Sequence, residues 1–101
     1  MGRIMNEDSK QRLHVFVHGR VQGVGFRHFV LSRASEWGIS GWVANRRDGS
    51  VEVTAEGEKE QLEDLLQILQ RGPASANVTG VDPEWGQATG EFYGFKVKMT
   101  Y

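Results

Sequence analysis

Apolar residues alternate with polar or aromatic ones along residues 12–18, and this two-residue period is typical of a strand that buries one face. After a glycine-rich turn the period changes, and apolar residues recur three or four positions apart along residues 26–37. That spacing predicts a helix, and Gly38 supplies its end, because glycine readily adopts the backbone angles of a helix C-terminus. This part of the chain is therefore predicted to be a strand, a turn and a helix.

Two runs rich in β-forming residues, 39–44 and 51–55, follow the first helix. The Asp48-Gly49 pair between them is a frequent turn sequence, so the two runs predict a hairpin. Leucines then recur at helical spacing within residues 58–72, where acidic residues open the segment and an Arg-Gly-Pro sequence closes it. These are the start and stop signals of a second helix.

The last quarter of the chain predicts two weaker strands. Residues 77–85 are interrupted by Gly80 and Pro83, which suits an edge strand or a bent one. Residues 95–101 alternate strictly, with Phe95 and every second residue after it on an apolar face and lysines or threonine on the other. The predicted order is β-α-β-β-α-β with one extra strand at the C-terminal end.

This order predicts an α+β fold of the ferredoxin-like class, an antiparallel sheet with two helices on one face and an extra C-terminal edge strand. In such a sheet the first two strands run parallel with the third between them. The turn after the first strand and the end of the second strand then meet at one end. Residues 12–101 are expected to form this domain, and the polar, aperiodic residues 1–11 a flexible tail.

Composition narrows the functional classes. Twelve Lys and Arg residues against thirteen Asp and Glu residues give a formal net charge of −1, which argues against a general nucleic-acid binder. The absence of cysteine excludes disulfides, thiolate nucleophiles and cysteine metal sites, and no apolar run approaches the length of a membrane span. A cytoplasmic protein is therefore the expectation.

The turn between the first strand and the first helix carries the most chemistry. It contains Gly19, Gly23 and Gly25 within the stretch VHGRVQGVGFR. Consecutive amides of a glycine-rich turn can converge on an anion, and a helix that starts there adds its positive dipole end. Arg27 could place its guanidinium over the same anion. The alternative is a tight corner with a solvated arginine, and from the turn alone both interpretations stay open.

The stretch VHGRVQGVGFR (Val17–Arg27), followed by GWVANRRDGSVEVTAEG (Gly41–Gly57), resembles the two signature motifs of the acylphosphatase family. The resemblance implies a ferredoxin-like fold and a monomeric enzyme. The implied reaction is hydrolysis of a small-molecule acyl phosphate to a carboxylate and inorganic phosphate, without a metal or cofactor. It places Arg27 where the family's essential arginine binds the phosphoryl group and Asn45 where its asparagine orients the attacking water. The expected phosphate cradle consists of Gly19, Arg20, Val21, Gln22, Gly23, Val24, Gly25, Phe26 and Arg27.

Two other classes stay open at this point. One is a non-catalytic anion-binding or regulatory ferredoxin-like module, such as the acylphosphatase-like segment of larger carbamoyl-transfer proteins. The other is an RNA-binding module of the same topology, although the aromatic signature of that class is missing from the central strands.

Several other polar residues have ordinary structural interpretations. Gln22 is expected to order the loop, and the three histidines to be structural or surface residues. Arg46 and Arg47 are interpreted as solvated residues of a hairpin tip. Glu56 is interpreted as part of a solvated helix start, since more glutamates follow it in the chain.

Overall fold

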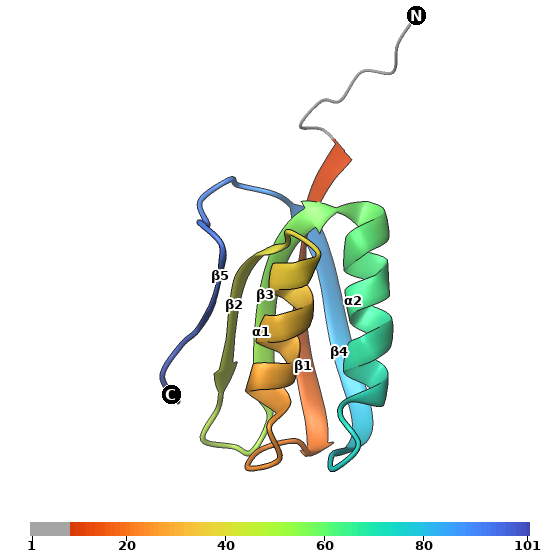
Figure 1. Ribbon diagram of the computed structural model, residues 1–101, viewed down its shortest axis with the longest axis vertical. Helices are drawn as coiled ribbons and strands as arrows, with labels where there is room; N and C mark the ends of the chain where they lie inside the picture. The colour runs from red at the N-terminus through yellow and green to blue at the C-terminus, as the bar shows by residue number, and fades with distance from the viewer. Residues whose placement is uncertain (1–8) are drawn as a thin grey trace, which may run out of the picture.

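The computed structural model describes residues 9–101, and Figure 1 shows their arrangement. The elements of this part of the chain, in order, are β1 (Lys10–Arg20), α1 (Phe26–Glu36), β2 (Ser40–Asn45), β3 (Val51–Glu58), α2 (Lys59–Arg71), β4 (Asn77–Gln87) and β5 (Phe95–Val97). The predicted order of strands and helices is confirmed. The fold is the predicted ferredoxin-like α+β arrangement.

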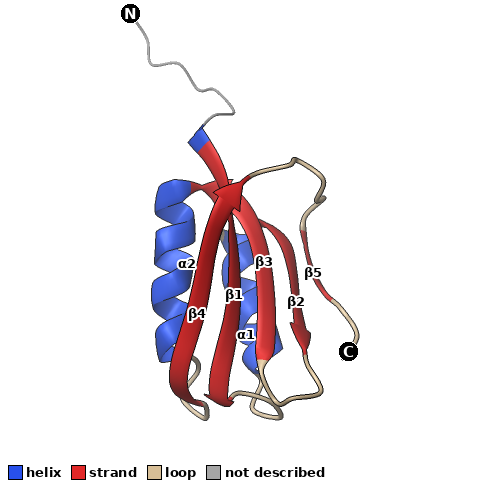
Figure 2. Ribbon diagram, turned by 180° about the vertical axis from the view of Figure 1, so that it is seen from behind, coloured by secondary structure: helices blue, strands red, loops and turns tan. Residues whose placement is uncertain are grey.

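The strands form one sheet in the order β4-β1-β3-β2-β5. Both helices lie on one face of it, in front of the sheet in Figure 1 and behind it in the reverse view of Figure 2. β3 pairs antiparallel with β1 on one side and with β2 on the other, so β1 and β2 run parallel as expected. One detail differs: β5 pairs parallel with β2, so the extra edge strand makes the sheet mixed rather than purely antiparallel.

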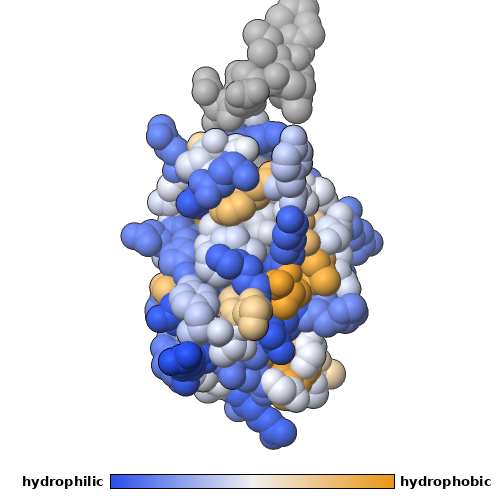
Figure 3. Space-filling view, turned by 90° about the vertical axis from the view of Figure 1, so that its left-hand side faces the viewer, coloured by the Kyte–Doolittle hydropathy of each residue, from blue (hydrophilic) through white to orange (hydrophobic). Residues whose placement is uncertain are grey.

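The boundaries of the outer elements differ from the predicted ones. β1 begins at Lys10, so the last two residues of the predicted tail belong to the strand, while residues 1–8 lie outside the described part. β5 ends at Val97 rather than at residue 101. The chain beyond it still follows β2, because the amide of Lys98 donates to the carbonyl of Val43 at 2.9 Å. Figure 3 views this edge of the sheet, where hydrophobic and hydrophilic side chains interleave.

The two helices begin in different ways. α2 starts with a capping box, in which the side chains of Glu58 and Gln61 each satisfy a backbone amide of the other's turn. α1 starts after Gly25, which has left-handed backbone angles (φ 78°, ψ 17°) and provides no side-chain cap. No acidic residue occupies the first turn of α1. Its exposed amides and its positive dipole end are therefore left for another partner.

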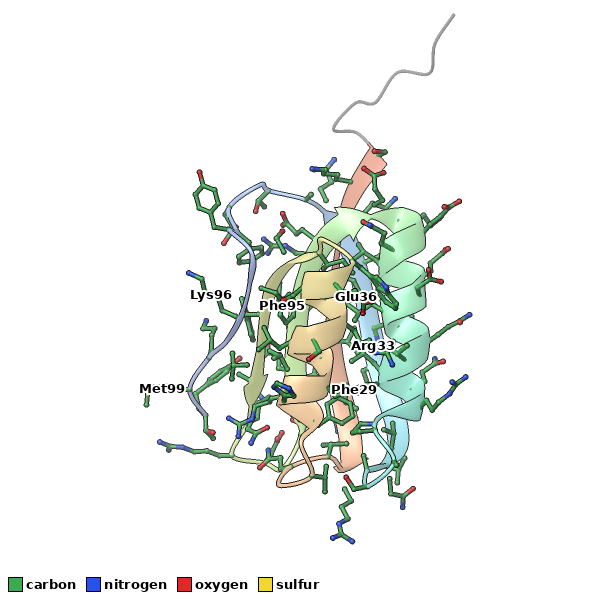
Figure 4. The ribbon with its side chains drawn as sticks, viewed as in Figure 1. Phe29, Arg33, Glu36, Phe95, Lys96 and Met99 are labelled. Atoms are coloured by element: carbon green, nitrogen blue, oxygen red, sulfur yellow. The ribbon has the colours of Figure 1, made fainter. Side chains whose placement is uncertain are left out.

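The core lies between the sheet and the helices. The alternating residues of β1 that face the helices are completely buried, as the period predicts, and Phe95 of β5 points inward beside α1 (Figure 4). The buried apolar residues of the cluster are Leu13, Val15, Val17, Val21, Phe26, Val30, Ala34, Ile39, Val43, Val51, Val53, Ala55, Leu62, Leu65, Leu69 and Phe95. Met99, expected on the same apolar face, instead points away from the domain and is 87% exposed.

The face of β3 that points away from the helices carries Glu52, Thr54 and Glu56, and all three are buried. Glu56 was expected to be solvated, and that interpretation is wrong. Its carboxylate accepts hydrogen bonds from the amides of Thr89 and Gly90 at 2.9 and 3.0 Å and from Arg12 Nε at 2.8 Å. The connection between β4 and β5 thus folds over Glu56 and covers it.

Glu56→Gln is expected to destabilise the fold at neutral pH. Burial alone would raise the pKa of Glu56, but the hydrogen bonds from Thr89, Gly90 and Arg12 lower it overall. A lowered pKa means that the carboxylate stabilises the fold above its unfolded-state pKa and loses this contribution as the pH falls through the folded-state value. We expect a loss of about 1–3 kcal/mol at pH 7 in urea unfolding, with less pH dependence below about pH 4.5.

Glu63→Gln, at an exposed position of α2, is the matched control and should leave the unfolding free energy close to that of the unaltered protein. Equal stability of the two variants at pH 7 would contradict the role given to Glu56.

Candidate active site

The register of the sheet brings the two predicted motifs together. Val51 of β3 pairs with Val17 of β1 on one side and with Asn45 of β2 on the other. Residues that pair directly across antiparallel strands point to the same face of the sheet. Asn45 therefore shares a face with Val17 and Val51, the face covered by the helices, at the end of the sheet where the β1–α1 loop leaves β1.

The β1–α1 loop reaches this place through glycines with positive φ angles, 73° at Gly23 and 78° at Gly25. A Cβ added to either would meet no atom within 4 Å, so here glycine is required by the backbone angle rather than by crowding. Such angles turn successive amides toward a common side, the arrangement of an anion-binding nest. α1 begins directly after the second of these glycines and adds its own amides.

A pocket of about 310 Å³ lies between the loop, the start of α1 and the end of β2. Six of its lining residues belong to the predicted site: Val21, Gly23, Gly25, Phe26, Arg27 and Asn45. The structure thus places the predicted arginine and asparagine in one cavity, together with the central part of the predicted cradle. Among residues 9–101 no carboxylate forms an ion pair with Arg27, which leaves its guanidinium available to an anion.

Four members of the predicted cradle do not line this pocket: Gly19, Arg20, Gln22 and Val24. Gly19 and Arg20 are the last residues of β1, where they pair with β4 beyond a shift in register. A Cβ on Gly19 would lie 2.2 Å from the carbonyl oxygen of Asn77. Glycine is therefore required at position 19 by the close approach of β1 and β4, and not by phosphate binding.

The side chain of Asn45 is unusual in its surroundings. It is 8% exposed, and its Oδ1 is buried without a hydrogen-bond partner among the described residues. A buried acceptor without a hydrogen-bond partner costs free energy. The unpaired Oδ1 of Asn45 therefore points to a partner that arrives with substrate or solvent. Asn45 lines the same pocket as Arg27.

Gln22 connects the two halves of the site. Its side-chain amide donates to the backbone carbonyls of Arg46 and Ser50 at 2.7 and 2.8 Å, so the β1–α1 loop is fastened to the hairpin that carries Asn45. The expectation that Gln22 orders the loop is confirmed.

The turn between β2 and β3 is stabilised at Asp48. Hydrogen bonds from the hydroxyl and the amide of Ser50 lower the pKa of Asp48.

Arg46 differs from the expected solvated residue. Its guanidinium lies 5.1 Å from the ring centroids of both Phe16 and Tyr101, and its Nη1 donates to Glu52 Oε1 at 3.0 Å. The neighbouring Arg47 is exposed, as expected, and its amide donates to the carbonyl of Tyr101. Arg46 is thus held on the sheet face opposite the helices, away from the pocket.

Sequence reasoning missed two residues that line the pocket, His28 and Val97. His28 follows Arg27 in the first turn of α1 and was interpreted as a structural or surface residue. Val97 comes from β5, and only the parallel pairing of β5 with β2 brings it to this end of the sheet. Within residues 9–101, no group of three or more His, Asp or Glu side chains is arranged to hold a metal ion.

These features define a ferredoxin-like domain with a pocket at one end of its sheet, lined by Arg27, Asn45 and the glycines of the β1–α1 loop. Residues 13–97 match the profile of the acylphosphatase family. An acylphosphatase from Pelotomaculum thermopropionicum is 46% identical over 89 residues, which cover 88% of this chain and 97% of the relative. The crystal structure of acylphosphatase from Bacillus subtilis is similar with a TM-score of 0.84 at 34% identity, over 87% of this chain and 98% of that chain.

The chain therefore belongs to the acylphosphatase family. A further solved structure, full-length HypF in its phosphate- and nucleotide-bound form, is similar to 99% of this chain with a TM-score of 0.83 at 25% identity. This match covers only 13% of the HypF chain.

Gln22→Glu is expected to weaken the connection between the loop and the hairpin. A carboxylate oxygen would replace the donating nitrogen opposite two carbonyl oxygens and would add negative charge next to the anion pocket. We expect a loss of about 1–3 kcal/mol in unfolding free energy, together with weaker binding of inorganic phosphate by calorimetric titration. Gln70→Glu, which adds the same charge at an exposed position of α2, should retain both properties; losses of the same size there would refute the assignment.

Proposed function

We propose a role for each residue of the pocket in the acylphosphatase activity that family membership gives this chain. Arg27 and the amides of the β1–α1 loop bind the phosphoryl group of an acyl phosphate, and Asn45 positions the water that attacks it. The observation that carries this proposal is the single pocket lined by both Arg27 and Asn45, together with the unpaired Oδ1 of Asn45.

The phosphoryl end of the substrate is doubly anionic, and the pocket is built to receive negative charge. Arg27 offers a planar fork of N–H donors, and the uncapped start of α1 offers backbone amides and the positive end of the helix dipole. These donors are fixed before substrate binds, so they can stabilise charge on the equatorial oxygens without reorganising. The residues proposed for binding are those of the predicted cradle that line the pocket: Val21, Gly23, Gly25, Phe26 and Arg27.

Asn45 positions the attacking water and does not act as a base. Its Oδ1 accepts a hydrogen bond from water and holds this water in line with the phosphorus–oxygen bond that breaks. A carboxylate is a good leaving group, so an acyl phosphate does not require a strong base to activate the water. The reaction gives a free carboxylate and inorganic phosphate, and the phosphate itself can accept the proton of the water.

The remaining properties of the protein are also proposals. We propose a monomer in the cytoplasm that acts on a small-molecule acyl phosphate rather than on nucleic acid. The near-neutral charge balance supports this choice of substrate class. No helix among residues 9–101 is long and apolar enough to cross a membrane. We further propose that the acylphosphatase domain starts at Lys10, the first residue of β1, rather than at residue 12.

The alternative is a non-catalytic anion-binding or regulatory module, which the similarity to one region of the much longer HypF chain favours. The enzyme is the better-supported function. The matched relatives named acylphosphatase are aligned over nearly their whole length, and the site retains the buried asparagine that a mere anion-binding module does not need.

Arg27→Ala is expected to abolish turnover chiefly by removing phosphate binding. Loss of one preorganised charge-stabilising donor costs about 3–4 kcal/mol in the transition state, which corresponds to a 10²- to 10³-fold fall in rate. Calorimetric titration with inorganic phosphate measures the binding part. Arg27→Lys, which keeps the charge but loses the fork, should recover only part of the affinity.

Asn45→Ala is expected to abolish hydrolysis of benzoyl phosphate while it leaves phosphate binding largely intact. The measurement is the initial rate in metal-free buffer, with a simple alkyl phosphate ester as a control substrate that should not react. Equal loss of phosphate affinity in the Arg27 and Asn45 variants would refute the division of roles. A folded, phosphate-binding protein that does not hydrolyse benzoyl phosphate would instead establish the non-catalytic module.

A further inference from the structure

The loop between α2 and β4, residues 72–76, lies beside the β1–α1 loop. None of its residues lines the pocket. Both loops are at the lower end of the molecule in Figure 1, together with the β2–β3 hairpin. A Cβ on Gly72 would lie 3.1 Å from the ring of Phe26. The hydroxyl of Ser75 donates to the backbone carbonyl of Val24 at 3.0 Å. The α2–β4 loop therefore lies close to two residues of the predicted cradle, Val24 and Phe26.

The hydrogen bond from Ser75 determines how one peptide group of the cradle is oriented. The carbonyl of Val24 and the amide of Gly25 belong to the same planar trans peptide, so they point in opposite directions. Ser75 holds the carbonyl toward the α2–β4 loop and does not itself line the pocket, whereas Gly25 does. The amide of Gly25 is consequently turned toward the pocket side.

This peptide group needs a restraint. It joins Val24 to Gly25, which has a positive φ angle, and glycine exchanges between positive and negative φ angles at little cost. Rotation of the peptide would replace an N–H donor at the pocket with a carbonyl oxygen, whose partial negative charge repels a phosphoryl group. A nest of amides binds anions only while its carbonyls point outward.

We propose that Ser75 is a positioning residue for the phosphoryl site: its hydroxyl holds the Val24–Gly25 peptide with the carbonyl outward and the amide toward the anion. The inference rests on the proposed function, because it assigns a restraint to the same phosphate-binding loop. Ser75 contacts neither substrate nor reacting atoms. It acts through the backbone of the β1–α1 loop.

The test is binding of inorganic phosphate and hydrolysis of benzoyl phosphate by Ser75→Ala. We expect the loss of the hydrogen bond from Ser75, which is exposed, to weaken phosphate affinity about 3- to 10-fold. KM should rise by the same factor with kcat unchanged, because the Gly25 amide contacts the phosphoryl group in both the ground state and the transition state. The phosphate-induced change in the Gly25 amide signal in a ¹⁵N–¹H NMR spectrum should shrink in parallel.

Ser75→Thr keeps the hydroxyl and should bind phosphate like the unaltered protein. Ser32→Ala, at an exposed position of α1 outside the pocket, removes a serine hydroxyl elsewhere and should also leave binding and rates unchanged. Unaltered phosphate affinity in Ser75→Ala, or an equal loss in Ser75→Thr, would overturn the inference while the proposed function stands. Failure of the unaltered protein to bind phosphate would overturn both.

Discussion

The pairing of Val51 with both Val17 and Asn45 is the constraint on which the site depends. Because β3 lies between β1 and β2, the ends of these two strands reach the same level of the sheet. Neighbouring strands are about 4.8 Å apart, so Asn45 lies about 10 Å across the sheet from Val17. That distance leaves room for the pocket that residues of the β1–α1 loop and the first turn of α1 line.

Much of this arrangement could be predicted from the sequence, since each step depends on a local pattern. The two-residue period of β1, the β-forming runs of β2 and β3 and the helical spacing of α1 and α2 determine the order of elements. This order selects the topology. The topology then brings Arg27 and Asn45 to the same end. The glycines at 23 and 25 mark positive φ angles because other residues adopt them only with strain.

What could not be predicted depends on contacts between distant segments. The three residues of β5 show an apolar period but not their partner, so the parallel pairing that brings Val97 to the pocket was not foreseen. Glu56 resembles the glutamates that follow it, and only the β4–β5 connection that covers it distinguishes it. Gly19 likewise resembles the loop glycines, although it is required by the approach of β4.

The separation of charges explains how a chain with a formal net charge of −1 can present an anion site. Successive residues of a strand point to opposite faces of the sheet, so Asn45 faces the helices while Glu52, paired with Ala44, faces away. Glu52 is neutralised there by Arg46 and Glu56 by Arg12. The sheet thus keeps these two buried carboxylates, each paired with an arginine, on the face opposite the pocket that Arg27 lines.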